Sequence, residues 1–163
     1  MGALSVSADN ALGGTAGGVM FDGGTLQLGS SFDLASTRAL SVAAGGGTID
    51  TQGFQSTVAQ DATGTGSFFK TGSGTLTIDG SLVGPIAAEV QQGTLVLNGS
   101  GAQRTGSVTV DQPGTLQASA QSLPSTVTNN GLVQFEQNVG RPKRNGITSL
   151  RITRRRRPGT SNG

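Results

Sequence analysis

The chain lacks several residue types on which enzymes and metal sites most often depend. Its 163 residues include no cysteine, no histidine, no tryptophan and no tyrosine. The missing cysteines exclude disulfides, cysteine nucleophiles and cysteine zinc ligands, and the missing histidines remove the commonest acid–base group near neutral pH. No apolar run approaches the roughly 18 residues of a membrane-spanning helix.

Charge is scarce and unevenly divided. Charged residues make up 12% of the chain and aromatic residues 4%, while 28 residues are glycine, so a folded core would have to be narrow. Residues 1–140 contain nine acids and three bases, whereas residues 141–163 contain eight bases and no acid. This contrast predicts a folded segment, 1–140, followed by a basic, disordered tail, 141–163.

A short motif recurs along the first segment. "GTLTIDG" begins at Gly74 and "GTLVLNG" at Gly93, and related stretches are "GALSV" at Gly2, "GTLQL" at Gly24, "GTIDT" at Gly47, "GTLQA" at Gly114 and "GLVQF" at Gly131. The seven glycines are spaced by 22, 23, 27, 19, 21 and 17 residues, a mean of about 21.5. Self-similarity at such a period is the signature of a repeat architecture.

Within each copy, polar and apolar residues alternate as in a strand with one buried face. The inward pairs would be Leu4/Val6, Leu26/Leu28, Ile49/Thr51, Leu76/Ile78, Leu95/Leu97, Leu116/Ala118 and Val133/Phe135, with Thr51 as the polar exception. A second short strand precedes most copies, and each glycine is expected to turn a tight corner by adopting positive φ.

One such unit is too thin to enclose a core, so stacked units must share one. The pattern therefore predicts an all-β fold, a single-stranded right-handed parallel β-helix (β-solenoid) of about seven coils. The outward threonines Thr25, Thr48, Thr75, Thr94 and Thr115 are expected to stack in one ladder. A flat or sandwich all-β domain is the alternative.

The stretch "GTGSFFKTGSGTLTIDG", Gly64 to Gly80, resembles the passenger-associated transport repeat of bacterial autotransporter passengers. Lys70, Gly72, Gly74, Leu76 and Ile78 fill places of that repeat, and "AEVQQGTLVLNGS", Ala88 to Ser100, resembles the half that follows. The resemblance extends over residues 2 to about 139. After Gly84 the chain departs from the pattern with "SLVGPIAAEV", and "RPKRNGITSLRITRRRRPGTSNG" resembles nothing in the family.

This resemblance implies a structural, adhesin-like passenger segment that assists its own export and lies at the cell surface, in the outer membrane or outside a Gram-negative bacterium. It also implies a C-terminal translocator β-barrel in the full-length protein and a host or cell-surface ligand of unknown identity. A fragment of a carbohydrate-active β-helix enzyme is the alternative, and a row of acids facing one groove would favour it.

Individual residues offer no catalytic, cofactor-binding or metal site. Asp50 and Asp79, near strand ends, are interpreted as turn residues in preference to calcium ligands, because calcium-binding repeats space their aspartates regularly. Lys70 is interpreted as a solvated lysine beside a strand in preference to a ligand contact. Asn98-Gly99-Ser100 matches a glycosylation sequon, but such a match carries little weight in a bacterial protein.

The "RRRR" run, Arg154 to Arg157, has the charge to contact phosphates but no aromatic residues for stacking, so we expect no specific nucleic-acid partner. The abrupt change in charge at the end of the repeats suggests a shifted reading frame or a fused end, and an unstructured native tail of no selected function is the alternative. Neither end of the repeat region shows an amphipathic capping segment, so we also expect self-association through uncapped ends.

Overall fold

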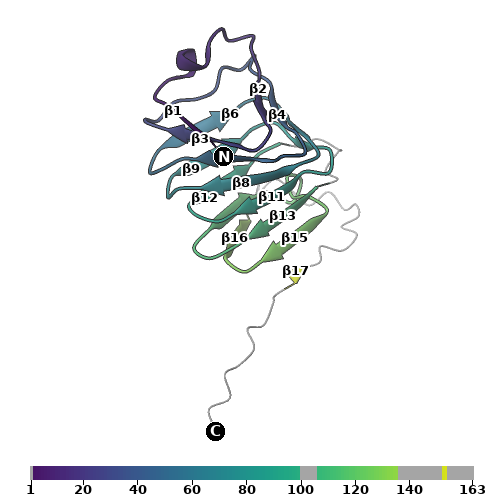
Figure 1. Ribbon diagram of the computed structural model, residues 1–163. Helices are drawn as coiled ribbons and strands as arrows, with labels where there is room; N and C mark the ends of the chain where they lie inside the picture. The colour runs from purple at the N-terminus through teal and green to yellow at the C-terminus, as the bar shows by residue number, and fades with distance from the viewer. Residues whose placement is uncertain (1, 100–105, 136–151, 154–163) are drawn as a thin grey trace, which may run out of the picture.

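The computed structural model describes residues 2–99, 106–135 and 152–153. Within them the chain is all-β apart from one short 3-10 helix, η1 (Asp9–Leu12). The chain winds in successive coils from the purple N-terminal end to the green C-terminal end (Figure 1). This is the predicted β-solenoid.

Three parallel sheets form the walls of the solenoid. Sheet A contains, in spatial order, β1 (Ala3–Val6), β3 (Gly24–Leu28), β5 (Gly47–Asp50), β8 (Ser67–Thr71), β11 (Ala87–Val90), β13 (Ser107–Val110), β15 (Thr126–Asn129) and β17 (Ile152–Thr153). Sheet B contains β10 (Leu82–Val83), β7 (Ala62–Gly64), β4 (Leu40–Val42) and β2 (Val19–Phe21). Sheet C contains β16 (Leu132–Phe135), β14 (Thr115–Ala118), β12 (Thr94–Leu97), β9 (Thr75–Ile78) and β6 (Gln55–Val58).

Every strand pairing among the described residues is parallel. From β1 to β15 the chain returns to sheet A six times, so the solenoid has about six turns, slightly fewer than the predicted seven coils. The difference arises because seven copies of the motif enclose six intervals.

The motif does not stay on one face of the solenoid. Its first three copies form β1, β3 and β5 of sheet A, whereas its last four form β9, β12, β14 and β16 of sheet C. The change of face falls in the step from Gly47 to Gly74, which at 27 residues is the longest. That step therefore contains one full turn and the additional distance to the next wall.

The predicted threonine ladder is consequently wrong as a single row. Thr25 pairs with Thr48 in sheet A, whereas Thr75, Thr94 and Thr115 are aligned in sheet C. The sequence pattern identified the outward side of each strand correctly but could not reveal that similar strands belong to two different walls.

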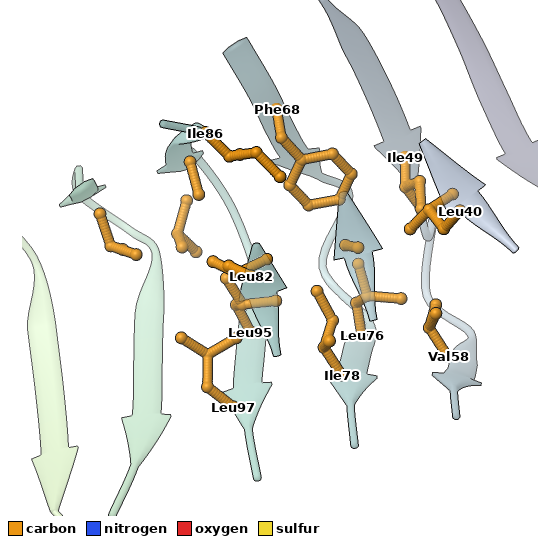
Figure 2. Packing of buried hydrophobic residues seen from close by; sticks show 14 of the residues in the cluster. Leu40, Ile49, Val58, Phe68, Leu76, Ile78, Leu82, Ile86, Leu95 and Leu97 are labelled. Atoms are coloured by element: carbon orange, nitrogen blue, oxygen red, sulfur yellow. The ribbon is translucent and has the colours of Figure 1, made fainter. Parts of the chain in front are cut away.

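Aliphatic side chains fill the interior in columns that run from coil to coil (Figure 2). Leu76, Leu95 and Leu116 lie side by side in the register of sheet C, and none of the three exposes any surface. Thr51, the polar exception, is also fully buried, and its hydroxyl donates to the carbonyl of Thr71 at 3.1 Å. The predicted inward pairs are buried except at the two ends, where Leu4 and Phe135 are 56% and 45% exposed and Val133 is half-buried.

The motif glycines serve mainly to let neighbouring coils approach closely. Among them Gly93 has the expected positive φ, +64°. Gly74 does not, but a Cβ atom there would collide with the backbone carbonyl of Phe54 in the preceding coil. A side chain at Gly74 would therefore push two coils apart.

Replacing Leu95 by alanine should lower the free energy of unfolding by about 2–5 kcal/mol, because the cavity lies between two other buried leucines. Val96→Ala is the matched control: Val96 is the next residue of β12 and points outward, so it should change stability by under about 1 kcal/mol. Urea unfolding followed by circular dichroism measures both. Equal losses in the two variants would contradict the assigned inward and outward faces.

Candidate functional site

Lys70 lies inside the solenoid, so the interpretation as a solvated lysine is wrong. It occupies an inward position of β8, between Ile49 of β5 and Val90 of β11, and exposes no surface. Its ammonium donates to the carbonyls of Thr71 at 2.9 Å, Gly72 at 2.8 Å and Gln92 at 3.0 Å. All three ammonium hydrogens therefore have backbone acceptors, and the bond to Gln92 joins two consecutive coils.

This environment changes the ionisation of Lys70. Burial lowers the pKa of Lys70 to about 8, although the nearby Asp50 carboxylate opposes the shift. The carbonyls are at the corner between sheets A and C, where Gly72 adopts a φ of +74°. Lys70 thus stabilises a corner from the inside.

Arg38 is the second buried cation, and the sequence analysis did not single it out. Its side chain is fully buried, and its Nε and Nη2 atoms donate to the two carboxylate oxygens of Asp9 at 2.7 and 3.0 Å. Further bonds reach the carbonyls of Asp9, Leu12, Gly13 and Gly17. Arg38 therefore holds the 9–17 segment, including η1, against the coil that follows it.

The Arg38–Asp9 pair has a clear electrostatic consequence. The hydrogen bond from Arg38 lowers the pKa of Asp9 despite partial burial, and the backbone N–H of Ala35 donates to the same carboxylate at 3.1 Å. A carboxyl group with a lowered pKa stabilises the fold above its ordinary titration range, and this contribution is lost as the pH falls through the folded-state value.

The remaining aspartates also connect coils. Asp22, Asp33 and Asp61 each accept a backbone N–H from the next coil, at 3.0, 2.7 and 2.7 Å. Asp111 accepts the side-chain amide of Asn130 at 3.1 Å. The partners are 19–24 residues apart in sequence, about one turn of the solenoid. These carboxylates act as structural acceptors between coils.

Asp50 and Asp79 belong to the same pattern. Asp50 accepts the backbone N–H of Gln52 at 2.9 Å, as expected of a turn residue, and the amide of Gln27 in the preceding coil at 3.0 Å. Burial opposes ionisation of Asp50, but these hydrogen bonds and the Lys70 charge outweigh it and lower its pKa. Asp79 accepts the side-chain amide of Asn98 at 2.8 Å, so it bonds to the next coil.

No part of the described chain brings three metal-ligating side chains of the aspartate, glutamate, histidine or cysteine type together. The two described acids that lie in strands have no acid beside them in the register: Asp50 is flanked by Gln27 and Thr71, and Glu89 by Phe69 and Thr109. None of the helical structure in the described ranges is long and apolar enough to cross a membrane. The described aspartates thus form hydrogen bonds between coils.

The outward face of sheet C is uncharged over its whole length. Its ten side chains are Gln55, Thr57, Thr75, Thr77, Thr94, Val96, Thr115, Gln117, Leu132 and Gln134. Gln117 donates to Gln134 at 2.7 Å, which ties two neighbouring coils. Sheet A differs, because it presents Asp50 and Glu89 outward.

Three sequence interpretations fall wholly or partly outside the described residues. In the Asn98-Gly99-Ser100 sequon, the Asn98 amide is bonded to Asp79, and Ser100 is not described. Of the predicted disordered tail, 141–163, the structure describes β17, whose Ile152 and Thr153 pair with Val127 and Thr128 of β15. The "RRRR" run itself lies outside the described residues.

Comparison of the chain with protein-family models, curated proteins and solved structures returns no match. Function must therefore be argued from the geometry above and from the sequence resemblance.

Lys70→Met should lower the free energy of unfolding, because it leaves the carbonyls of Gly72 and Gln92 without the ammonium donor, at about 1–3 kcal/mol for each unsatisfied group. Ile49→Met, in the same column, is the control and should cost under about 1.5 kcal/mol. Urea unfolding at pH 7 compares the two variants.

The same pair of proteins tests the ionisation of Lys70. Since the folded-state pKa is near 8 and an unfolded lysine titrates near 10.4, the unfolded chain binds more protons between these values. Wild-type stability should therefore rise relative to Lys70→Met from about pH 8 to pH 10, a range with no tyrosine, cysteine or histidine to interfere. A difference that does not change with pH would show that Lys70 keeps an ordinary pKa.

Acid should release the 9–17 segment. Protonating Asp9 below its ordinary value of 3.8 removes the partner of a buried guanidinium, and Asp9→Asn should have the same effect at neutral pH. Hydrogen exchange in residues 9–17, corrected for intrinsic rates, should become faster in both cases. Asp61→Asn keeps an oxygen acceptor for Ser81 and should leave exchange in 9–17 unchanged. Unchanged exchange in Asp9→Asn would mean that the carboxylate is not needed to hold the segment.

Proposed function

We propose that the chain is a segment of a surface-exposed, adhesin-like autotransporter passenger. Its role is structural: a stiff scaffold that presents loops and assists its own export by folding outside the cell. In this proposal the protein belongs to the cell surface or surroundings of a Gram-negative bacterium. Its full-length form carries a C-terminal translocator β-barrel, and its ligand is a host or cell-surface molecule.

The observation that carries the proposal is the unbroken apolar column between coils in parallel register. Leu76 of β9, Leu95 of β12 and Leu116 of β14 pack directly on one another. Because each coil needs only its neighbour for burial, coils can fold one after another as a chain emerges. This property suits a protein that must be unfolded to cross a membrane and then fold without an external energy source.

The polar groups support the same role. Seven aspartates, from Asp9 to Asp111, accept hydrogen bonds from neighbouring coils. The two buried cations, Arg38 and Lys70, bond to backbone carbonyls. Charged groups that would otherwise be available for chemistry are thus engaged in holding the coils together.

A fragment of a carbohydrate-active β-helix enzyme is the alternative in a different class. Such an enzyme needs a pair of carboxyl groups flanking one bond of its substrate. No acid lies beside another acid in the register of the described strands, and each described aspartate is engaged with a neighbouring coil. We therefore favour the scaffold.

A display experiment tests the proposal. The full chain is placed between a signal peptide and an autotransporter β-barrel in a Gram-negative bacterium, with an epitope tag at Met1. The wild-type chain should reach the surface and yield a protease-resistant fragment, because outside folding completes export. Leu95→Asp should reduce both readouts by disrupting the core, whereas Val96→Asp on the outward face of β12 should leave them nearly unchanged.

Retention of the wild-type chain in the periplasm would contradict the proposal. Equal display of Leu95→Asp and Val96→Asp would contradict the link between folding and export.

A further inference from the structure

The strand β6 forms one edge of sheet C, where among the described strands it pairs only with β9. Its sequence, QSTV, contains neither a charged residue nor a proline. Edge strands without these protective residues readily add another strand. The preceding coil contributes residues 29–36 beside this edge, and these residues contain no strand. The free side of β6 therefore requires backbone partners of another kind.

The backbone groups on that free side belong to Gln55 and Thr57. On the opposite side, the carbonyl of Val58 accepts the N–H of Asp79 at 2.9 Å, just after β9. The hydrogen-bonding groups of successive residues in a strand point to opposite edges. Gln55 and Thr57 therefore direct their N–H and carbonyl groups away from β9, toward the preceding coil.

Side chains of the preceding coil bond to these groups. The hydroxyl of Ser31 accepts the N–H of Gln55 at 3.1 Å, and the carboxylate of Asp33 accepts the N–H of Thr57 at 2.7 Å. The backbone N–H of Leu34 donates to the carbonyl of Thr57 at 3.0 Å. Because Ser31 and Asp33 are two residues apart, their acceptors repeat with the period of a strand.

Residues 31–36 thus form an edge guard, and contacts on both sides fix it in place. Leu34 anchors the guard in the core, where it is 5% exposed. The N–H of Ala35 donates to the carboxylate of Asp9 in the first coil at 3.1 Å. The side-chain amide of Gln60 donates to a carbonyl of the guard from the following coil. The guard is therefore held by the coils before and after it.

We propose that the edge guard protects β6 from strand addition, and that the strand it excludes is one from a second copy of this chain. The two side-chain acceptors and the N–H of Leu34 occupy the backbone groups that an added strand would use. A second copy suits this edge because the outward face of sheet C is uncharged, so two copies meet there without like-charge repulsion.

Removing the two acceptors tests the guard. Ser31→Ala/Asp33→Ala frees the N–H groups of Gln55 and Thr57 but keeps the Leu34 anchor. Both lost bonds lie at the surface, where water can replace the acceptors, so the variant should fold. Ser31→Thr/Asp33→Asn is the matched control, because it retains an oxygen acceptor at each position. Asp33→Ala alone is measured in parallel and carries the test if the double variant does not fold, which circular dichroism checks.

Hydrogen exchange at low protein concentration measures the guard itself. In the alanine variant the N–H groups of Gln55 and Thr57 should exchange roughly fivefold faster or more, since each loses one hydrogen bond. The N–H of Val58, which faces β9, is the internal reference and should keep its wild-type rate. Wild-type exchange at Gln55 and Thr57 in the alanine variant would overturn the proposal.

Sedimentation velocity over a range of concentrations measures strand addition. The alanine variant should form larger species than the wild type and the Thr/Asn control at equal concentration. Adding Thr57→Pro to it removes the N–H on the free side of β6 and should return association to the wild-type level. Association no greater than that of the wild type would overturn the proposal. Association that persists with Thr57→Pro would place the contact away from β6 and overturn it as well.

Discussion

The structure depends on one constraint: every coil must present its inward side chains, in register, to the coil on either side. The backbone is satisfied by parallel pairing along the whole described rod, and the aliphatic columns are satisfied only while that register holds. The close approach at Gly74 follows from this constraint, because the carbonyl of Phe54 occupies the space a side chain would need. A short glycine-rich repeat therefore allows neighbouring coils to approach closely enough to form such a wall.

The buried cations show how the rod accommodates departures from its own repeat. Lys70 lies between two aliphatic neighbours in its column, Ile49 and Val90, and its burial is tolerated because three carbonyls at a glycine corner accept its hydrogens. Arg38 has a different role. The 9–17 segment leaves the regular coil, and Arg38 donates hydrogen bonds to backbone carbonyls of this segment. In each case a charge is buried where irregular backbone would otherwise be unsatisfied.

Much of the fold could be predicted from periodicity alone. The alternation around Leu76 and Leu95 correctly assigned strands, their buried faces and the solenoid class. It could not reveal that "GTIDT" and "GTLTI" lie on different walls, because a strand's local pattern carries no information about which face of a coil it occupies. Periodicity also could not predict the roles of Lys70 and Arg38, since both side chains bond to carbonyls that neighbouring coils bring close. Lys70 did have one signal, an inward position in the alternation of "SFFKT".

The scaffold interpretation assumes that neighbouring coils are held in the stated register. Cysteine pairs test this directly, because the chain contains no cysteine of its own. Thr94 and Thr115 are register partners in β12 and β14, so their Cα atoms are about 4.8 Å apart, within disulfide range. The variant Thr94→Cys/Thr115→Cys should form an intramolecular disulfide under mild oxidation, whereas Thr94→Cys/Gln117→Cys, displaced by two residues, should not. Equal cross-linking of the two pairs, or a preference for the displaced pair, would contradict the parallel in-register solenoid.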